Sequence, residues 1–235
     1  IENTKGLTFK SLWKDLNKLD TQDKISVIEE NFHKSDVAIE NDNYERNFLK
    51  DQCEHELIVS IDADEMLIEA KDFFIDFLPL ATPYLDKHDI CMTWATPYKE
   101  IDDTTLVIAD LDQTPFFGEN QGFLTHKDST FTYARWTDKS QTGMGRILSP
   151  LIAVHYSLCR EKDDLHKKIH NIGHSDIVEK DPFYETWIQV TLENYHELRN
   201  FKTSGLGEAQ WPCLYPVKTD QLVDYYRQFS VKAYQ

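Results

Sequence analysis

Residues 57–65 of the chain read Leu57-Ile58-Val59-Ser60-Ile61-Asp62-Ala63-Asp64-Glu65. A largely apolar run that ends abruptly in acidic residues is typical of a strand buried on both faces of a sheet. In open α/β sheets, ligands bind in the crevice beyond the carboxyl ends of such strands. The pattern therefore predicts a buried central strand over residues 57–61, with Asp62 and Asp64 at the ligand-binding edge.

Helical and extended patterns alternate on both sides of this run. Apolar residues at helical spacing predict helices over residues 9–19, 43–53, 161–172, 182–198 and 219–229. Extended patterns predict strands over residues 24–28, 90–96, 104–109, 131–136 and 147–156. A helix over residues 71–85 is expected to be interrupted by Pro79 and Pro83, and the polar stretch 110–145 is expected to form long loops.

This order of elements predicts a single α/β domain over residues 1–235. The expected architecture is a Rossmann-type mixed sheet flanked by helices. Because the chain opens at Ile1 rather than at Met, the first strand of such a sheet is not accounted for.

The composition describes a folded, strongly acidic chain. Of its 235 residues 40% are hydrophobic, and 25 Lys and Arg stand against 41 Asp and Glu, giving a net charge of −16. Such a field repels a nucleic-acid backbone, so a phosphorylated ligand would need a metal or a few basic residues. Four cysteines without close spacing favour a reducing, cytoplasmic location, and no run is apolar enough to predict a transmembrane segment.

Asp62 and Asp64 would lie on the same side of an extended chain. Two carboxylates suit Mg²⁺ or Mn²⁺, which bind carboxylates together with substrate phosphate oxygens. The alternative is structural, because an acidic chain contains Asp-x-Asp by chance, as at Asp110-Leu111-Asp112. The pair would then only end a strand and begin a helix. The spacing alone leaves both interpretations open.

Four segments, in this order, resemble motifs of GT-A fold glycosyltransferases. They are Ile1–Thr8, Arg46-Asn47-Phe48-Leu49, the run ending in Asp62-Ala63-Asp64-Glu65, and His155–Arg160 with Lys168-Ile169 and His174 downstream. The last is similar to the His-x-x-x-x-Arg … Lys-Ile … His pattern of inverting, family 2-like members. The resemblance implies a GT-A-like fold that moves a sugar from a nucleotide-diphospho-sugar to an acceptor hydroxyl with Mn²⁺ or Mg²⁺ bound.

The resemblance also implies roles for the matching residues. Asp64 would be the main metal ligand, and Asp62 a second ligand or a contact to the ribose. His155 and His174 would complete the metal site, although His155 on its own is equally typical of a hydrogen-bonded core histidine. Arg46 would lie near the nucleotide or the sugar. Residues 1–110 would then bind donor and metal, and residues 111–235 would bind the acceptor and carry the C-terminal helices.

The diphosphate also needs basic residues, which are scarce. An arginine can bind a diphosphate in a bidentate manner, and the candidates are Arg135, Arg146 and Arg160. Arg160 is preferred because it follows the strand predicted to end near His155, and Lys168 is the second choice. For each of these residues, a surface ion pair with a surplus carboxylate is the alternative.

An inverting transfer also needs a carboxylate that accepts the proton of the acceptor hydroxyl. Glu119 and Asp138 are candidates in the predicted loops, although the Glu-Asp pair typical of inverting members is absent. The expected acceptor is a glycan, a lipid-linked sugar or another hydroxyl compound. A nucleic-acid acceptor is disfavoured by the charge of −16.

Two other functions remain open. His166, His170 and His174 lie four residues apart and would form a stripe that can bind zinc, which predicts a metal-dependent hydrolase. Lysines stand between them where a general-base Glu is expected, which weighs against that function. The other alternative is a non-catalytic module that binds a sugar nucleotide without turnover.

Overall fold

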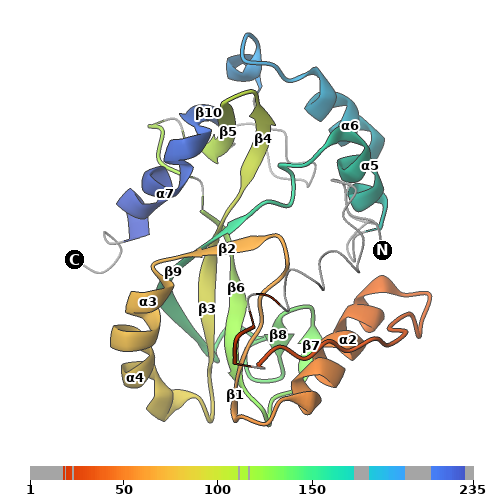
Figure 1. The fold of residues 1–235 in the computed structure, drawn as a ribbon, viewed down its shortest axis with the longest axis vertical. Coiled ribbons are helices and arrows are strands. Elements are labelled where there is room, and N and C mark those ends of the chain that lie inside the picture. The colour runs from red at the N-terminus through yellow and green to blue at the C-terminus, as the bar shows by residue number, and fades with distance from the viewer. Residues whose placement is uncertain are drawn as a thin grey trace.

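The computed structural model describes residues 18, 20–22, 24–110, 112–115, 117–171, 180–198 and 213–230. Within them the chain forms a mixed α/β fold, which confirms the predicted class at that level. The framework is a five-stranded mixed sheet, a three-stranded antiparallel sheet and a two-stranded hairpin, with helices on the outside (Figure 1). No helix in these residues is long and apolar enough to cross a membrane.

The five-stranded sheet carries the acidic run. Its strands lie in the order β1 (Leu57–Val59), β6 (Phe117–His126), β3 (Asp89–Ala95), β9 (Arg146–His155) and β2 (Glu65–Ile68). β3 and β9 are parallel, and all other neighbours are antiparallel. Because Ala95 pairs with Val154, β3 and β9 end side by side, and His155 is the last residue of β9.

Helices pack on this sheet through apolar side chains. A helical segment is made of α3 (Ala70–Asp72), a π-helical turn (Phe73–Phe77), α4 (Leu78–Ala81) and a 3₁₀ turn (Thr82–Tyr84). It buries Phe73 against Phe123 and Leu151 of the sheet. α7 (Leu222–Ser230) packs Tyr226 against β2 and β9. α2 (Ala38–Gln52) lies beside the hairpin of β7 (Phe131–Tyr133) and β8 (Trp136–Thr137).

A second core lies beyond the end of β9. The three-stranded sheet has the order β10 (Cys213–Lys218), β5 (Thr104–Ala109) and β4 (Pro97–Ile101). Two helices, α5 (Lys162–Asn171) and α6 (Lys180–Gln189), pack against it through Leu165, Ile169 and Trp187. Since α5 starts a few residues after His155, this core fixes the direction in which the chain leaves β9.

The central strand predicted over residues 57–61 is wrong in two respects. β1 ends at Val59, and it is an edge strand, so that Val59 and Ile61 are 40% and 49% exposed. Its one partner among the described strands is β6, which forms within the stretch predicted as loops. Gly, Asn and Gln are typical of loops, but pairing with β1 on one side and β3 on the other overrides that preference.

Several other predictions are confirmed. β3, β5 and β9 match the strands expected over residues 90–96, 104–109 and 147–156, and α2, α5 and α7 match predicted helices. The helical segment after β2 continues through Pro79 and Pro83, because each lies in the first turn of a helical piece, where a missing N–H costs no hydrogen bond.

The remaining differences lie mainly outside the large sheet. The strand predicted over residues 24–28 is wrong, since these residues have no regular structure and are exposed. The patterns do not predict β2, β4 or β10. The expected strand over 131–136 is the hairpin of β7 and β8, and α6 ends at Gln189 rather than at Leu198. All but one residue of the helix predicted over residues 9–19 lies outside the described residues.

Candidate functional site

One connection joins the two edge strands of the five-stranded sheet. It runs from β1 at one edge to β2 at the other (Figure 1). The Ser60 amide donates to the Phe123 carbonyl at 2.8 Å, and the Tyr156 amide donates to the Asp64 carbonyl at 2.8 Å. The connection is therefore tied to β6 at its start and to the residue after β9 at its end. Residues 60–65 are called the crossover segment below.

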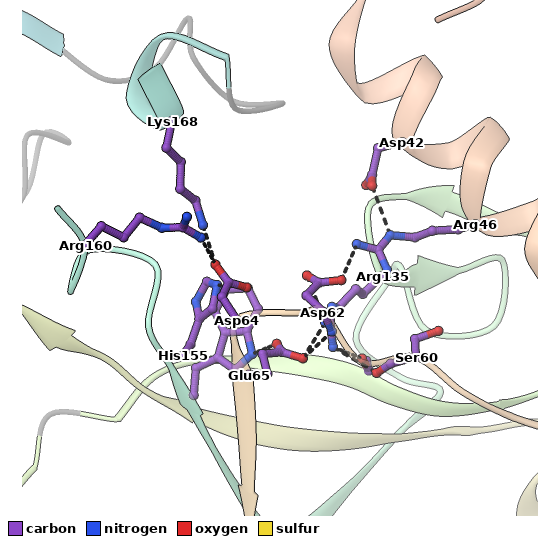
Figure 2. A network of polar contacts seen from close by, with 12 residues as sticks. Asp42, Arg46, Ser60, Asp62, Asp64, Glu65, Arg135, His155, Arg160 and Lys168 are labelled. Carbon is purple, nitrogen blue, oxygen red and sulfur yellow. Dashed lines mark hydrogen bonds and ion pairs between the residues drawn. The ribbon is translucent and has the colours of Figure 1, made fainter. Parts of the chain in front are cut away.

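Asp64 is the centre of a group of cationic side chains (Figure 2). Its Oδ2 atom accepts hydrogen bonds from Arg160 Nη2 and Lys168 Nζ, both at 2.6 Å. Its Oδ1 atom lies 3.6 Å from His155 Nε2. The three partners come from the end of β9, the loop after it and α5. The structure thus brings together four residues that the sequence patterns single out separately.

These contacts control the protonation of Asp64. Partial burial on its own would raise the pKa of the carboxyl group. The contact with His155 and the hydrogen bond from Lys168 outweigh burial and hold the pKa of Asp64 well below its usual value. Asp64 is therefore a carboxylate at every ordinary pH.

The low pKa of Asp64 predicts acid sensitivity. A carboxyl group whose pKa is lower in the folded state stabilises the fold above its unfolded pKa, about 3.9, and loses that contribution as the pH falls through the folded value. Between roughly pH 6 and pH 2, the wild type should lose about 2 kcal/mol more unfolding free energy than Asp64→Asn. Urea unfolding at each pH, with a chelator present, measures this difference. Parallel pH curves for the two proteins would contradict it.

Asp62 belongs to a different group of charges. It accepts from Arg135 Nη2 at 2.9 Å and from Arg46 Nη2 at 3.3 Å, and Arg46 also binds Asp42 at 3.1 Å. Burial opposes ionisation of Asp62, but the charges of Arg135 and Arg46 prevail and lower its pKa. Asp62 and Asp64 therefore do not share partners.

The expectation that Asp62 and Asp64 lie on the same side is wrong. The chain does not stay extended beyond β1 but turns at residues 63–64, and the Glu65 amide donates to the Asp62 carbonyl at 3.1 Å. This turn directs Asp62 toward Arg46 and Asp64 toward Arg160 (Figure 2).

Glu65 holds the crossover segment in place. Its side chain is 0% exposed and is paired at 2.7 Å with Arg135, which is 2% exposed. It also accepts from Trp94 Nε1 at 2.7 Å and from the backbone amide of Asp62 at 2.9 Å. The Trp94 ring in turn lies 4.0 Å from the ring of His155. The sequence gives no signal for this positioning role, because Glu65 is only the third acid of the run.

The two acidic groups face two cavities. A cavity of about 930 Å³ is lined by Asp64 and Arg160 together with Glu100, Tyr156 and Trp187, among others. A second cavity of about 540 Å³ is lined by Asp62 and Arg46. No sequence signal identifies Glu100 or Tyr156. Nothing in their local sequence pattern distinguishes these two from ordinary residues of a strand end and a turn.

Other predicted residues lie elsewhere. Asp138 follows β8, is exposed, accepts from the Thr130 amide at 2.9 Å, and lines neither cavity. Glu119 is in β6, but its side chain is outside the described residues, as is all of His174. The rings of His166 and His170 lie 4.4 Å apart on α5, where His166 is exposed and His170 is half-buried. Arg146 stacks on Trp136 instead of facing either cavity.

The prediction of a metal fits part of this site. Within the described ranges, no three His, Cys, Asp or Glu side chains converge. Asp64 Oδ1 and His155 Nε2 lie close together, and both atoms can bind a metal ion. Mg²⁺ keeps several waters and typically binds through one or two carboxylates plus substrate phosphates. Within the described residues, Asp64 and His155 therefore supply two donors of the kind that a divalent cation binds, which is fewer than a complete set of ligands.

Comparison of the chain with protein-family models, with curated proteins and with solved structures finds no match. Any function must therefore be proposed from the residues and the geometry alone.

Proposed function

We propose that this chain is a GT-A-like glycosyltransferase that moves a sugar from a nucleotide-diphospho-sugar to an acceptor hydroxyl. The observation that carries the proposal is the convergence of His155, Arg160 and Lys168 on Asp64, across as many as 104 positions of sequence. All four residues belong to segments that carry the motif resemblance. A purely structural ion pair needs one cation, whereas this carboxylate has two cations and an imidazole at a cavity wall.

The basic residues would bind the diphosphate. Arg160 and Lys168 supply positive charge beside Asp64 and so favour the charge that builds on the departing diphosphate. Asp64 and His155 would hold the divalent cation, Mn²⁺ or Mg²⁺, which when bound offsets more of that charge. Arg46 and Asp62, at the smaller cavity, would contact the nucleotide and its ribose.

The larger cavity would receive the acceptor. Trp187 lines this cavity but is only 4% exposed, with Lys99 over its ring, so the assignment rests on the acids of the cavity, which suit an uncharged acceptor. Glu100 lines this cavity and has no ion pair within the described part of the chain, so we assign it the proton-accepting role for which Glu119 and Asp138 were the candidates. The acceptor hydroxyl would then form its new bond to the anomeric carbon as the bond to the diphosphate breaks.

Ligand-dependent thermal stability tests the proposal. UDP or GDP at a hundredfold excess over its dissociation constant, with Mn²⁺, should raise the melting temperature by about 5 °C or more, because a ligand of the native state stabilises it. A smaller rise is expected with chelator in place of Mn²⁺. The corresponding nucleoside is the matched control and should give almost none.

The same experiment separates the alternatives. Stabilisation by zinc alone, with none by either nucleoside diphosphate, would favour a hydrolase built on the histidines of α5 and would contradict the proposal. Nucleotide-dependent stabilisation without hydrolysis of any UDP-sugar or GDP-sugar would indicate a binding module and would contradict the transfer step.

A further inference from the structure

Arg160 and Lys168 bind a diphosphate in the proposed function, yet both already bind Asp64. We infer that Asp64 competes with the diphosphate for these two cations and fills their anion site until a ligand arrives. The inference rests on the proposed function, because it concerns the same site, but its decisive measurement needs no metal, sugar or acceptor.

Arg160 is held by contacts that do not depend on Asp64, and so is the backbone of Lys168. Arg160 Nη1 donates to Asp164 at 2.7 Å, and Arg160 Nε donates to the Ser157 carbonyl at 3.1 Å. Lys168 is on α5, which is fixed by the buried side chains of Leu165 and Ile169. Arg160 would therefore stay in place if Asp64 withdrew, and the ammonium group of Lys168, at the end of a flexible side chain, would follow the incoming anion.

Asp64, in contrast, is on a turn at the wall of the larger cavity. Its side chain and those of Arg160 and Lys168 are 19%, 25% and 23% exposed, so an anion can reach them from solvent. A single carboxylate oxygen accepts both short hydrogen bonds, as a phosphate oxygen would. Exchange of one oxygen anion for another preserves the charge balance of the two cations.

The other oxygen of Asp64 links this exchange to the proposed metal. This oxygen, Oδ1, lies 3.6 Å from His155 Nε2, and the two atoms are the pair proposed to bind the metal. A carboxylate that shares its charge with a divalent cation holds Arg160 and Lys168 less strongly. Metal and diphosphate should therefore bind cooperatively, each increasing the affinity of the other by the same factor.

Binding of inorganic pyrophosphate in a chelating buffer tests the competition. Asp64→Asn keeps the size of the side chain but removes its charge, and it should bind pyrophosphate at least about tenfold more tightly than the wild type, by titration calorimetry. Asp163→Asn is the matched control. It removes the same charge from α5 but has no ion pair among the described residues, so its affinity should change less than about twofold.

Three further substitutions locate the effect. In the Asp64→Asn background, Arg160→Gln and Lys168→Gln should each abolish the gain in affinity, whereas Lys162→Gln, on the same helix and at the same cavity, should retain most of it. If Asp64→Asn does not fold, Asp64→Ser replaces it. An unchanged or weaker pyrophosphate affinity in a folded Asp64 variant overturns the inference.

The outcomes also separate this inference from the proposed function. If the wild type binds UDP or GDP with Mn²⁺ but Asp64→Asn gains no pyrophosphate affinity, the competition is wrong and the function stands. If Asp64→Asn gains affinity but no nucleoside diphosphate binds the wild type, the competition stands and the function is wrong.

Discussion

Replacing Arg135 with Met is expected to lower the free energy of unfolding by about 3–5 kcal/mol. Arg135 is 2% exposed and pairs with Glu65, whose side chain is fully buried. Without the guanidinium, Glu65 keeps its hydrogen bonds from Trp94 and the Asp62 amide but loses its counter-charge. A substitution that leaves a buried charge without a counter-charge is among the most destabilising changes in a protein interior.

Urea unfolding near neutral pH measures this loss, and two variants serve as controls. Arg227→Met breaks exposed ion pairs with Glu69 and Asp224 and should cost less than about 1 kcal/mol. Adding Glu65→Gln to Arg135→Met should recover part of the stability, since the buried charge is then removed as well. A loss of under about 1 kcal/mol in Arg135→Met would show that Glu65 does not depend on this pair.

Changing Asp64 to Asn is expected to reduce Mn²⁺-dependent turnover of the donor by at least about a hundredfold. The variant removes the charged member of the donor pair with His155 while keeping the size of the side chain. Release of nucleoside diphosphate from a panel of UDP-sugars and GDP-sugars measures turnover. The same change should tighten binding of pyrophosphate in a chelating buffer, so binding and turnover should move in opposite directions.

Asp163→Asn is the control for this prediction as well, because it changes the net charge equally and lies on the exposed face of α5. Thermal unfolding of both variants verifies that they fold. Undiminished turnover in a folded Asp64→Asn protein would refute the assignment of Asp64.

The sequence predicts best those helices and strands whose own residues are apolar enough to require burial. β9 is a long apolar run, and its end at His155 was predicted to within one residue. The patterns do not predict β6, because its composition is polar and Gly122 within it is typical of a loop. The glycine is required for another reason: a Cβ atom there would lie 2.2 Å from the Arg135 carbonyl oxygen. A glycine at a close backbone approach has the same sequence signal as a glycine in a turn.

The sequence patterns single out the members of this charge cluster but not the contacts between them. Asp64, His155, Arg160 and Lys168 carry recognisable residue types, and the fold brings them together. The separation of Asp62 from Asp64 depends on the turn at residues 63–64. That turn is fixed by Glu65 with distant partners, Arg135 and Trp94. Local spacing carries no information about partners that lie 29 and 70 positions away.

The crossover segment has one more consequence. Ala63 borders both hollows, with Asp62 on one side of it and Asp64 on the other. The partition between the two compartments is therefore only one small residue thick at this point. Molecules bound on its two sides would be near neighbours, and any movement of this short piece of backbone would reshape both compartments at once.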